Sequence, residues 1–143
     1  MERNRVLEEL RRLHAQILQN LDVMDGLVGA PAPEPSQLAA TRYALTRASR
    51  ARTILIERAY PALLQHASPA QRAVIERLRE DGKAGLARSA QHIGSWTMQE
   101  VIAKWADYCA ASDALRTEMR RRVSAEADCL YPLLADMAGS SMP

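Results

Sequence analysis

Apolar residues recur every three or four positions through most of this chain, which is the period of an amphipathic helix. The first such stretch spans about residues 3–28 and ends at Gly29, where the proline-rich segment GAPAPEPS (29–36) begins. Its apolar positions are Val6, Leu10, Leu13, Ile17, Leu21, Met24 and Val28. The pattern predicts one long helix followed by a stiff connector.

Two further helical stretches follow, with a strong helix-start signal between them. The second runs from about Ser36 to His66. The segment SPAQ (68–71) then supplies an N-cap serine, a first-turn proline and a capping-box glutamine. The third stretch begins there and is weakened by Gly82, Gly85 and Gly94. The positions expected to face the core are Leu38, Leu45, Ala48, Leu55, Ala59 and Leu63 on the second stretch and Ile75, Leu78, Leu86, Ile93 and Trp96 on the third.

The last part of the chain begins with another helix-start pattern, TMQE (97–100). We expect the final helix to be broken around residues 110–113 and to end in a frayed tail over residues 139–143. Its expected core positions are Trp105, Tyr108, Leu115, Met119, Val123, Leu130 and Leu133. Four amphipathic helices with short links predict an all-α fold, an antiparallel up-down four-helix bundle, as a single domain over residues 1–138.

Composition agrees with a helical domain and narrows the classes of function. Hydrophobic residues make up 48% of the 143 positions, enough to form a core without metals or disulfides, and the 4% of aromatic residues disfavours sheet. A net charge of +2 is too small to indicate a nucleic-acid-binding surface. The charged, amphipathic start of the chain resembles neither a signal peptide nor a membrane span, so we expect no membrane partner.

The two cysteines indicate a reducing environment. Cys109 and Cys129 lie twenty positions apart on what reads as one helix. A continuous helix separates them by about 30 Å, which is too far for a disulfide bond. Free thiols favour a cytoplasmic location.

Two similar halves are visible in the order of a few residues. Tyr60-Pro61 and Tyr131-Pro132 each stand late in a predicted helix, where a proline removes only one backbone hydrogen bond. A lone histidine, His14 or His92, precedes each pair on an earlier helix. This arrangement predicts a duplicated helical hairpin, and two coincidental dipeptides are the alternative.

The motif LHAQI around His14, the second histidine-bearing helix and the two Tyr-Pro pairs together resemble the hemerythrin-like, or HHE cation-binding, four-helix bundles. The resemblance covers nearly the whole chain. Members of that family carry His-x-x-x-Glu ahead of an aromatic-Pro pair on helices two and four, and they hold two irons. The resemblance places Ala51 and Leu55 at these ligand positions on the second helix, and Arg122 and Glu126 on the last.

The ligand set that the resemblance implies is thereby reduced to His14, His92 and Glu126, which cannot support a di-iron site. Arg122 moreover brings a permanent positive charge. We therefore expect no metal and no cofactor. An Arg122–Glu126 ion pair is expected to replace the metals, because a buried carboxylate needs a partner. In the alternative, Arg122 extends along the core edge and places its charge in water. His14 lies between Leu10 and Ile17, and we expect it to be a hydrogen-bonded core histidine in preference to a metal ligand.

The sequence contains no supported Ser-His-Asp or Cys-His arrangement, phosphate-binding glycine loop or zinc-type cysteine pairing, so we expect no enzyme. The favoured function is a non-enzymatic interaction or regulatory module that uses an outer groove or a homodimer face to bind a protein partner or small ligand. The alternative is a sensor of a metal, oxygen or a small ligand that uses the remaining histidines and Glu126. In a third reading, the glycines of the third helix and Ala44, Ala48 and Ala51 leave a cavity for an apolar ligand.

Overall fold

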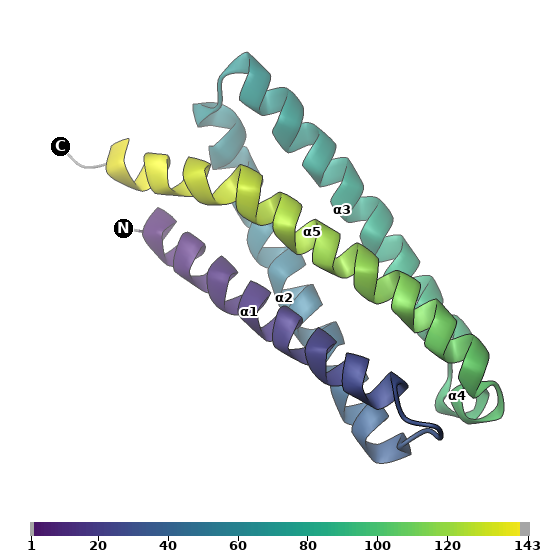
Figure 1. The fold of residues 1–143 in the computed structure, drawn as a ribbon. Coiled ribbons are helices and arrows are strands. Elements are labelled where there is room, and N and C mark those ends of the chain that lie inside the picture. Colours follow the sequence, from purple (N-terminus) through teal and green to yellow (C-terminus); the bar gives the residue numbers. More distant parts are fainter. Residues whose placement is uncertain (1, 141–143) are drawn as a thin grey trace.

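A computed structural model of the chain describes residues 2–140, and these form five helices (Figure 1). The helices are α1 (Glu2–Val28), α2 (Pro35–His66), α3 (Pro69–Ser95), α4 (Met98–Ala103) and α5 (Trp105–Ser140). Residues 2–140 include no strand, so the all-helical prediction is confirmed. Residues 141–143 of the expected frayed tail lie outside the described part, and α5 continues to Ser140.

The helix starts form where the polar capping residues stand. The Ser68 side chain accepts a hydrogen bond from the Gln71 backbone at 3.2 Å, and the Gln71 side chain accepts one from the Ser68 backbone at 2.8 Å. Thr97 caps α4 in the same way by accepting from the Glu100 backbone at 3.2 Å. These side chains satisfy backbone N–H groups that have no partner inside the helix.

The break expected around residues 110–113 is wrong, because α5 passes through this segment without interruption. Its alanines favour helix, and the Ser112 hydroxyl accepts a hydrogen bond from Arg116 Nε at 3.2 Å on the same helix. The chain departs from helical geometry earlier, at Lys104, where φ is −128° and ψ is 55°. α5 begins directly after this residue.

The long helices lie side by side, with the two described ends of the chain at one end of the molecule and α4 at the other (Figure 1). α1 packs along both α2 and α5. α3 packs mainly on α5 and meets α2 over a shorter stretch. Ion pairs hold α3 to α5 at the surface, including Arg121 with Asp81 and Arg88 with Glu118, both at 2.9 Å.

The core consists of three apolar clusters along the length of the molecule. The cluster nearest the chain ends contains Leu7, Leu10, Ile56, Tyr60, Leu63, Ile75, Leu78, Leu130, Leu134 and Met137. The central cluster contains Ile17, Leu21, Ala48 and Val123. The cluster at the α4 end contains Met24, Leu38, Val101 and Tyr108, with Trp96 and Trp105 packed around Tyr108.

Two expected core residues of α3 are exposed instead. Leu86 is 47% exposed and Ile93 is 44% exposed. Their spacing is that of a buried stripe, but α3 stands away from α2 along this stretch. Their side chains therefore line an open groove.

Both cysteines lie on the uninterrupted α5 and are free thiols, in agreement with their spacing. Both Tyr-Pro pairs lie inside helices, with Pro61 in α2 and Pro132 in α5. Among helices within residues 2–140, none combines the length and the apolar composition needed to cross a bilayer.

Candidate functional site

Glu126 is the centre of a buried network of polar side chains. This residue of α5 is 4% exposed. Its Oε1 lies 2.8 Å from Nε2 of His14 on α1, and its Oε2 accepts a hydrogen bond from Nη1 of Arg52 on α2 at 2.8 Å. Nδ1 of His14 is in turn 2.5 Å from the Tyr131 hydroxyl. The network therefore joins α1, α2 and α5 through one carboxylate.

The partner of Glu126 is Arg52, which corrects the expected pairing with Arg122. Within residues 2–140, Arg122 makes no ion pair with Glu126. Because Arg52 comes from a different helix, its guanidinium approaches the carboxylate from across the core. The four-residue spacing of Arg122 and Glu126 places them on one face of α5 but leaves their charged ends apart.

The inward face of α2 is shifted by one residue from the expected ligand positions. Arg52, Ile56 and Tyr60 are buried at a spacing of four, whereas Ala51 is exposed and Leu55 is half-buried at the edge of the core. Arg52, and neither Ala51 nor Leu55, is therefore the α2 residue that reaches Glu126. The sequence signal for Arg52 was its place in the same four-residue series as two large apolar side chains.

The electrostatics of the network keep Glu126 ionised. Burial by itself raises the pKa of this carboxyl group, but the hydrogen bond from His14 and the positive charge of Arg52 outweigh it. The pKa consequently lies below its usual value of 4.5. A buried carboxylate with two hydrogen-bonding partners on other helices fixes the relative positions of those helices.

Arg122 is buried in a different way from Arg52. It is 5% exposed, so it does not extend into water, and its Nε has no hydrogen-bond partner. The guanidinium lies against Gly85 of α3, where an added Cβ would be only 2.7 Å from Cζ of Arg122. Burial and the charge of Arg52 lower the pKa of Arg122 from its usual value. Gly85 is thus the residue that makes room for this side chain.

His92 stands apart from the other two residual ligand candidates. It is half-buried near the C-terminal end of α3, and its ring centroid lies 5.8 Å from that of Tyr108. Burial and the charge of Arg42 lower its pKa. Among the side chains that the structure describes, those of residues 5–137, no group of three or more His, Cys, Asp and Glu residues could hold a metal ion. With Arg52 on Glu126 and His92 elsewhere, the donors present do not fit a di-iron centre.

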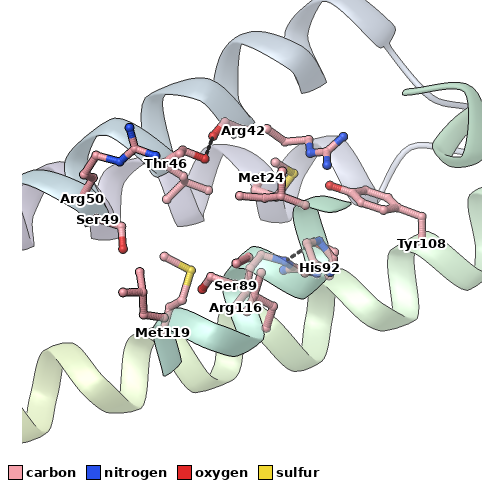
Figure 2. Close-up of a pocket in the computed structure, with 16 residues that line it drawn as sticks. Met24, Arg42, Thr46, Ser49, Arg50, Ser89, His92, Tyr108, Arg116 and Met119 are labelled. Atoms are coloured by element: carbon pink, nitrogen blue, oxygen red, sulfur yellow. Dashed lines mark hydrogen bonds between the residues drawn. The ribbon is translucent and has the colours of Figure 1, made fainter. Parts of the chain in front are cut away.

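An open apolar cavity of about 150 Å³ lies between α2 and α3, over α5 (Figure 2). Residues of α2 such as Thr46 and Ser49 lie on one side of it, and Ser89 of α3 and Met119 of α5 lie on the other. Its apolar lining comes from Met24, Leu45, Leu86, Ile93, Leu115 and Met119, and Arg42, Arg50 and Arg116 also reach it. We name this space the apolar compartment.

A second cavity of about 260 Å³ lies further along the same groove. We name it the charged compartment, because its lining includes Arg52, Arg79, Lys83, Arg122, Glu57 and Glu126. Tyr60 and Gly82 also line it, and Leu86 lines both compartments. The exposure of Leu86 and Ile93 was not predicted, since a periodic pattern does not reveal whether a neighbouring helix covers it.

The cysteines are poor candidates for nucleophiles. Burial raises the pKa of both Cys109 and Cys129. The thiolate is the reactive form, and a raised pKa reduces its population at neutral pH.

Comparison of the chain with models of known protein families, with curated proteins and with solved structures gave no match.

Proposed function

We propose that this chain is a non-enzymatic binding module that takes an apolar small molecule into the groove between α2 and α3. The observation that carries the proposal is the apolar compartment, which opens at the surface and has aliphatic and thioether side chains from several helices in its lining. Leu86 and Ile93 are large side chains left about half exposed there. A concave apolar surface with a few polar groups is typical of ligand sites, and covering it with a ligand is favourable.

A regulatory or interaction role is consistent with this site, because a ligand between α2 and α3 contacts helices that otherwise meet over a short stretch. We also propose the antiparallel up-down bundle and the hemerythrin-like ancestry expected from the sequence. The buried Arg52–Glu126–His14 network supports a metal-free version of that scaffold, since side chains alone satisfy Glu126. Free thiols favour a reducing compartment such as the cytoplasm.

Titration of a neutral apolar probe tests the proposal. Calorimetry with 1-octanol, or its displacement of the fluorescent dye Nile red, should show saturable binding to the full chain. Ala90→Trp places a large ring in the apolar compartment, which Ala90 lines, and should weaken binding about tenfold or more. Treating the protein with a chelator should leave the affinity unchanged, because no metal is needed.

The matched control is Ala87→Trp. Ala87 is an exposed residue of the same helix and does not line either compartment. Its substitution should leave 1-octanol binding as in the wild type. Absence of saturable binding to the wild type, or equal binding by the wild type and Ala90→Trp, contradicts the proposed function.

A further inference from the structure

Arg122 is a buried guanidinium, and none of the described side chains, those of residues 5–137, forms an ion pair with it. It is 5% exposed, and its Nε has no hydrogen-bond partner. Glu126 is already bonded to Arg52 and His14. A buried charge without a partner is one of the most costly features that a core can contain. Such a side chain is suited to binding an anionic group that enters from outside the protein.

The charged compartment has an excess of positive charge at its floor. Arg52, which is 3% exposed, lines it beside Arg122, and its Nε also has no hydrogen-bond partner. Of these two guanidinium groups, Arg52 is the one that pairs with Glu126. The other carboxylate in the lining, Glu57, is paired with Arg79 at 3.2 Å. An anion would therefore complete the charge balance of this cavity.

The charged compartment continues directly from the apolar one. Ser49 and Met119 line the apolar compartment, and Arg52 and Arg122 follow three residues later on the same two helices. Three helical residues correspond to about 4.5 Å along the helix axis. Leu86 of α3 borders both spaces. A single molecule with a headgroup and an attached apolar chain can thus occupy both compartments.

We propose that the groove binds an amphiphilic carboxylate, with its apolar chain in the apolar compartment and its carboxylate at Arg122 beside Arg52. This inference rests on the proposed function, because the apolar chain uses the same site. A carboxylate presents two oxygens that match the donor geometry of a guanidinium group. A cationic headgroup would be repelled by Arg52 and Arg122, and a neutral one would leave the charge of Arg122 unpaired.

Two probes that differ only in the headgroup test the inference. Octanoate and 1-octanol carry the same number of carbon atoms, and calorimetry gives the affinity of the full chain for each. The wild type should bind octanoate about tenfold or more tightly than 1-octanol, because hydrogen bonds to a charged group are strong. Arg122→Met should reduce this ratio to about one while leaving the affinity for 1-octanol within about twofold.

The neighbouring substitution Arg121→Met is the matched control. It changes the net charge equally, but Arg121 is exposed, pairs with Asp81 and Glu118, and lies outside both compartments. The octanoate preference should therefore persist in this variant. Equal affinities of the wild type for the two probes contradict the carboxylate site and leave the proposed function standing, whereas failure of both probes to bind contradicts both. An equal loss of the octanoate preference in Arg121→Met and Arg122→Met also contradicts the inference. The preference would then come from the overall positive charge of the protein and not from contact with Arg122.

A second pair of variants tests the same site without changing any charge. Gly85→Ala displaces the Arg122 guanidinium, whereas a Cβ added at Gly94 of the same helix meets nothing within 4 Å, and Gly94 lines neither compartment. Gly85→Ala should lose most of the octanoate preference and Gly94→Ala should keep it. Retention of the full octanoate preference in Gly85→Ala contradicts the position assigned to the carboxylate. This test applies even if Arg122→Met does not fold.

Discussion

At the scale of single residues, Glu126 connects more of the molecule than any other polar group described above. Its two oxygens contact residues of α1 and α2 across the core, and the side chain is almost completely enclosed. Glu126 therefore contributes to the stability of the fold by neutralising the positively charged side chains around it. Arg52 forms its ion pair with this carboxylate, and the negative charge of Glu126 also acts on Arg122 together with those of Asp81 and Glu118.

Glu126→Gln should lower the free energy of unfolding by about 3–5 kcal/mol, because it leaves buried positive charge without a carboxylate. Chemical denaturation followed by circular dichroism measures the change. Glu118→Gln on the same helix is the control, since Glu118 pairs with Arg88 and Arg121 near the surface and its loss should cost about 1 kcal/mol or less. Similar costs for the two substitutions would show that the network contributes little.

Some of these residues were accessible from the sequence and others were not. His14, Glu126 and Arg122 stood out because each interrupts an apolar stripe with a group that can hold charge or bind a metal. Arg52 was not predicted, because the family resemblance places the ligand positions of this helix at Ala51 and Leu55. Pairing across the core depends on how the helices are rotated about their axes, and the pattern along one helix does not determine this.

At the scale of helices, the residue at which a helix begins is determined by local capping side chains, which can be recognised in the sequence. The capping residues Ser68 and Thr97 each stand immediately before a helix, as predicted. The expected break in α5 does not occur. A helix ends where other groups replace its backbone hydrogen bonds, and residues 110–113 provide no such groups. The sequence offered an apolar cavity beside the third helix only as an alternative, because the position of the groove depends on the distance between α2 and α3.

The glycines of α3 have different roles, and alanine substitutions distinguish them. Alanine should gain about 1 kcal/mol of helix stability over glycine at either Gly82 or Gly85. At Gly85 the added methyl group collides with Arg122, while at Gly82 it reaches only an ordinary contact. Gly82→Ala should therefore be more stable than the wild type, and Gly85→Ala should be less stable than Gly82→Ala by about 1 kcal/mol or more.

Thermal and chemical denaturation of the two variants under identical conditions measures this difference. Equal stabilisation by both substitutions would mean that Arg122 moves aside at no cost. In that case its buried position is not enforced by the close approach of α3.

At the scale of the whole molecule, several carboxylates stabilise the folded state only while they are ionised. Hydrogen bonds from Arg120 and Arg116 lower the pKa of Asp25 against its partial burial, and this pairing joins α1 to α5. A hydrogen bond from Arg121 similarly lowers the pKa of Glu118. Together with Glu126, these groups make stability depend on pH across much of the structure.

Acid should destabilise the protein, and the sign follows from the lowered pKa of Glu126. The folded protein binds this proton less readily than the unfolded chain, so the contribution is complete above the unfolded value near 4.5. It is lost as the pH falls through 4.5 and then through the lower folded pKa. Chemical denaturation at a series of pH values measures this effect. As the pH is lowered below about 4.5, the denaturant concentration at the midpoint should fall more steeply for the wild type than for Glu126→Gln.

Comparing the two proteins removes the effect of the other carboxylates, because Asp25 and Glu118 are present in both. Parallel pH profiles for wild type and Glu126→Gln would contradict the lowered pKa. A difference that appears only above neutral pH would contradict it as well.

The placement of the indole rings gives the molecule a built-in optical reporter. Both tryptophans of the chain, Trp96 and Trp105, pack around Tyr108, and Tyr108 itself lines the apolar compartment. Their emission consequently senses the α4 end and any molecule entering beside it, without an attached dye. No tryptophan lies beside the network of His14 and Glu126. A tryptophan emission spectrum that changes while the circular dichroism of the helices stays constant therefore identifies an event at the α4 end of the protein.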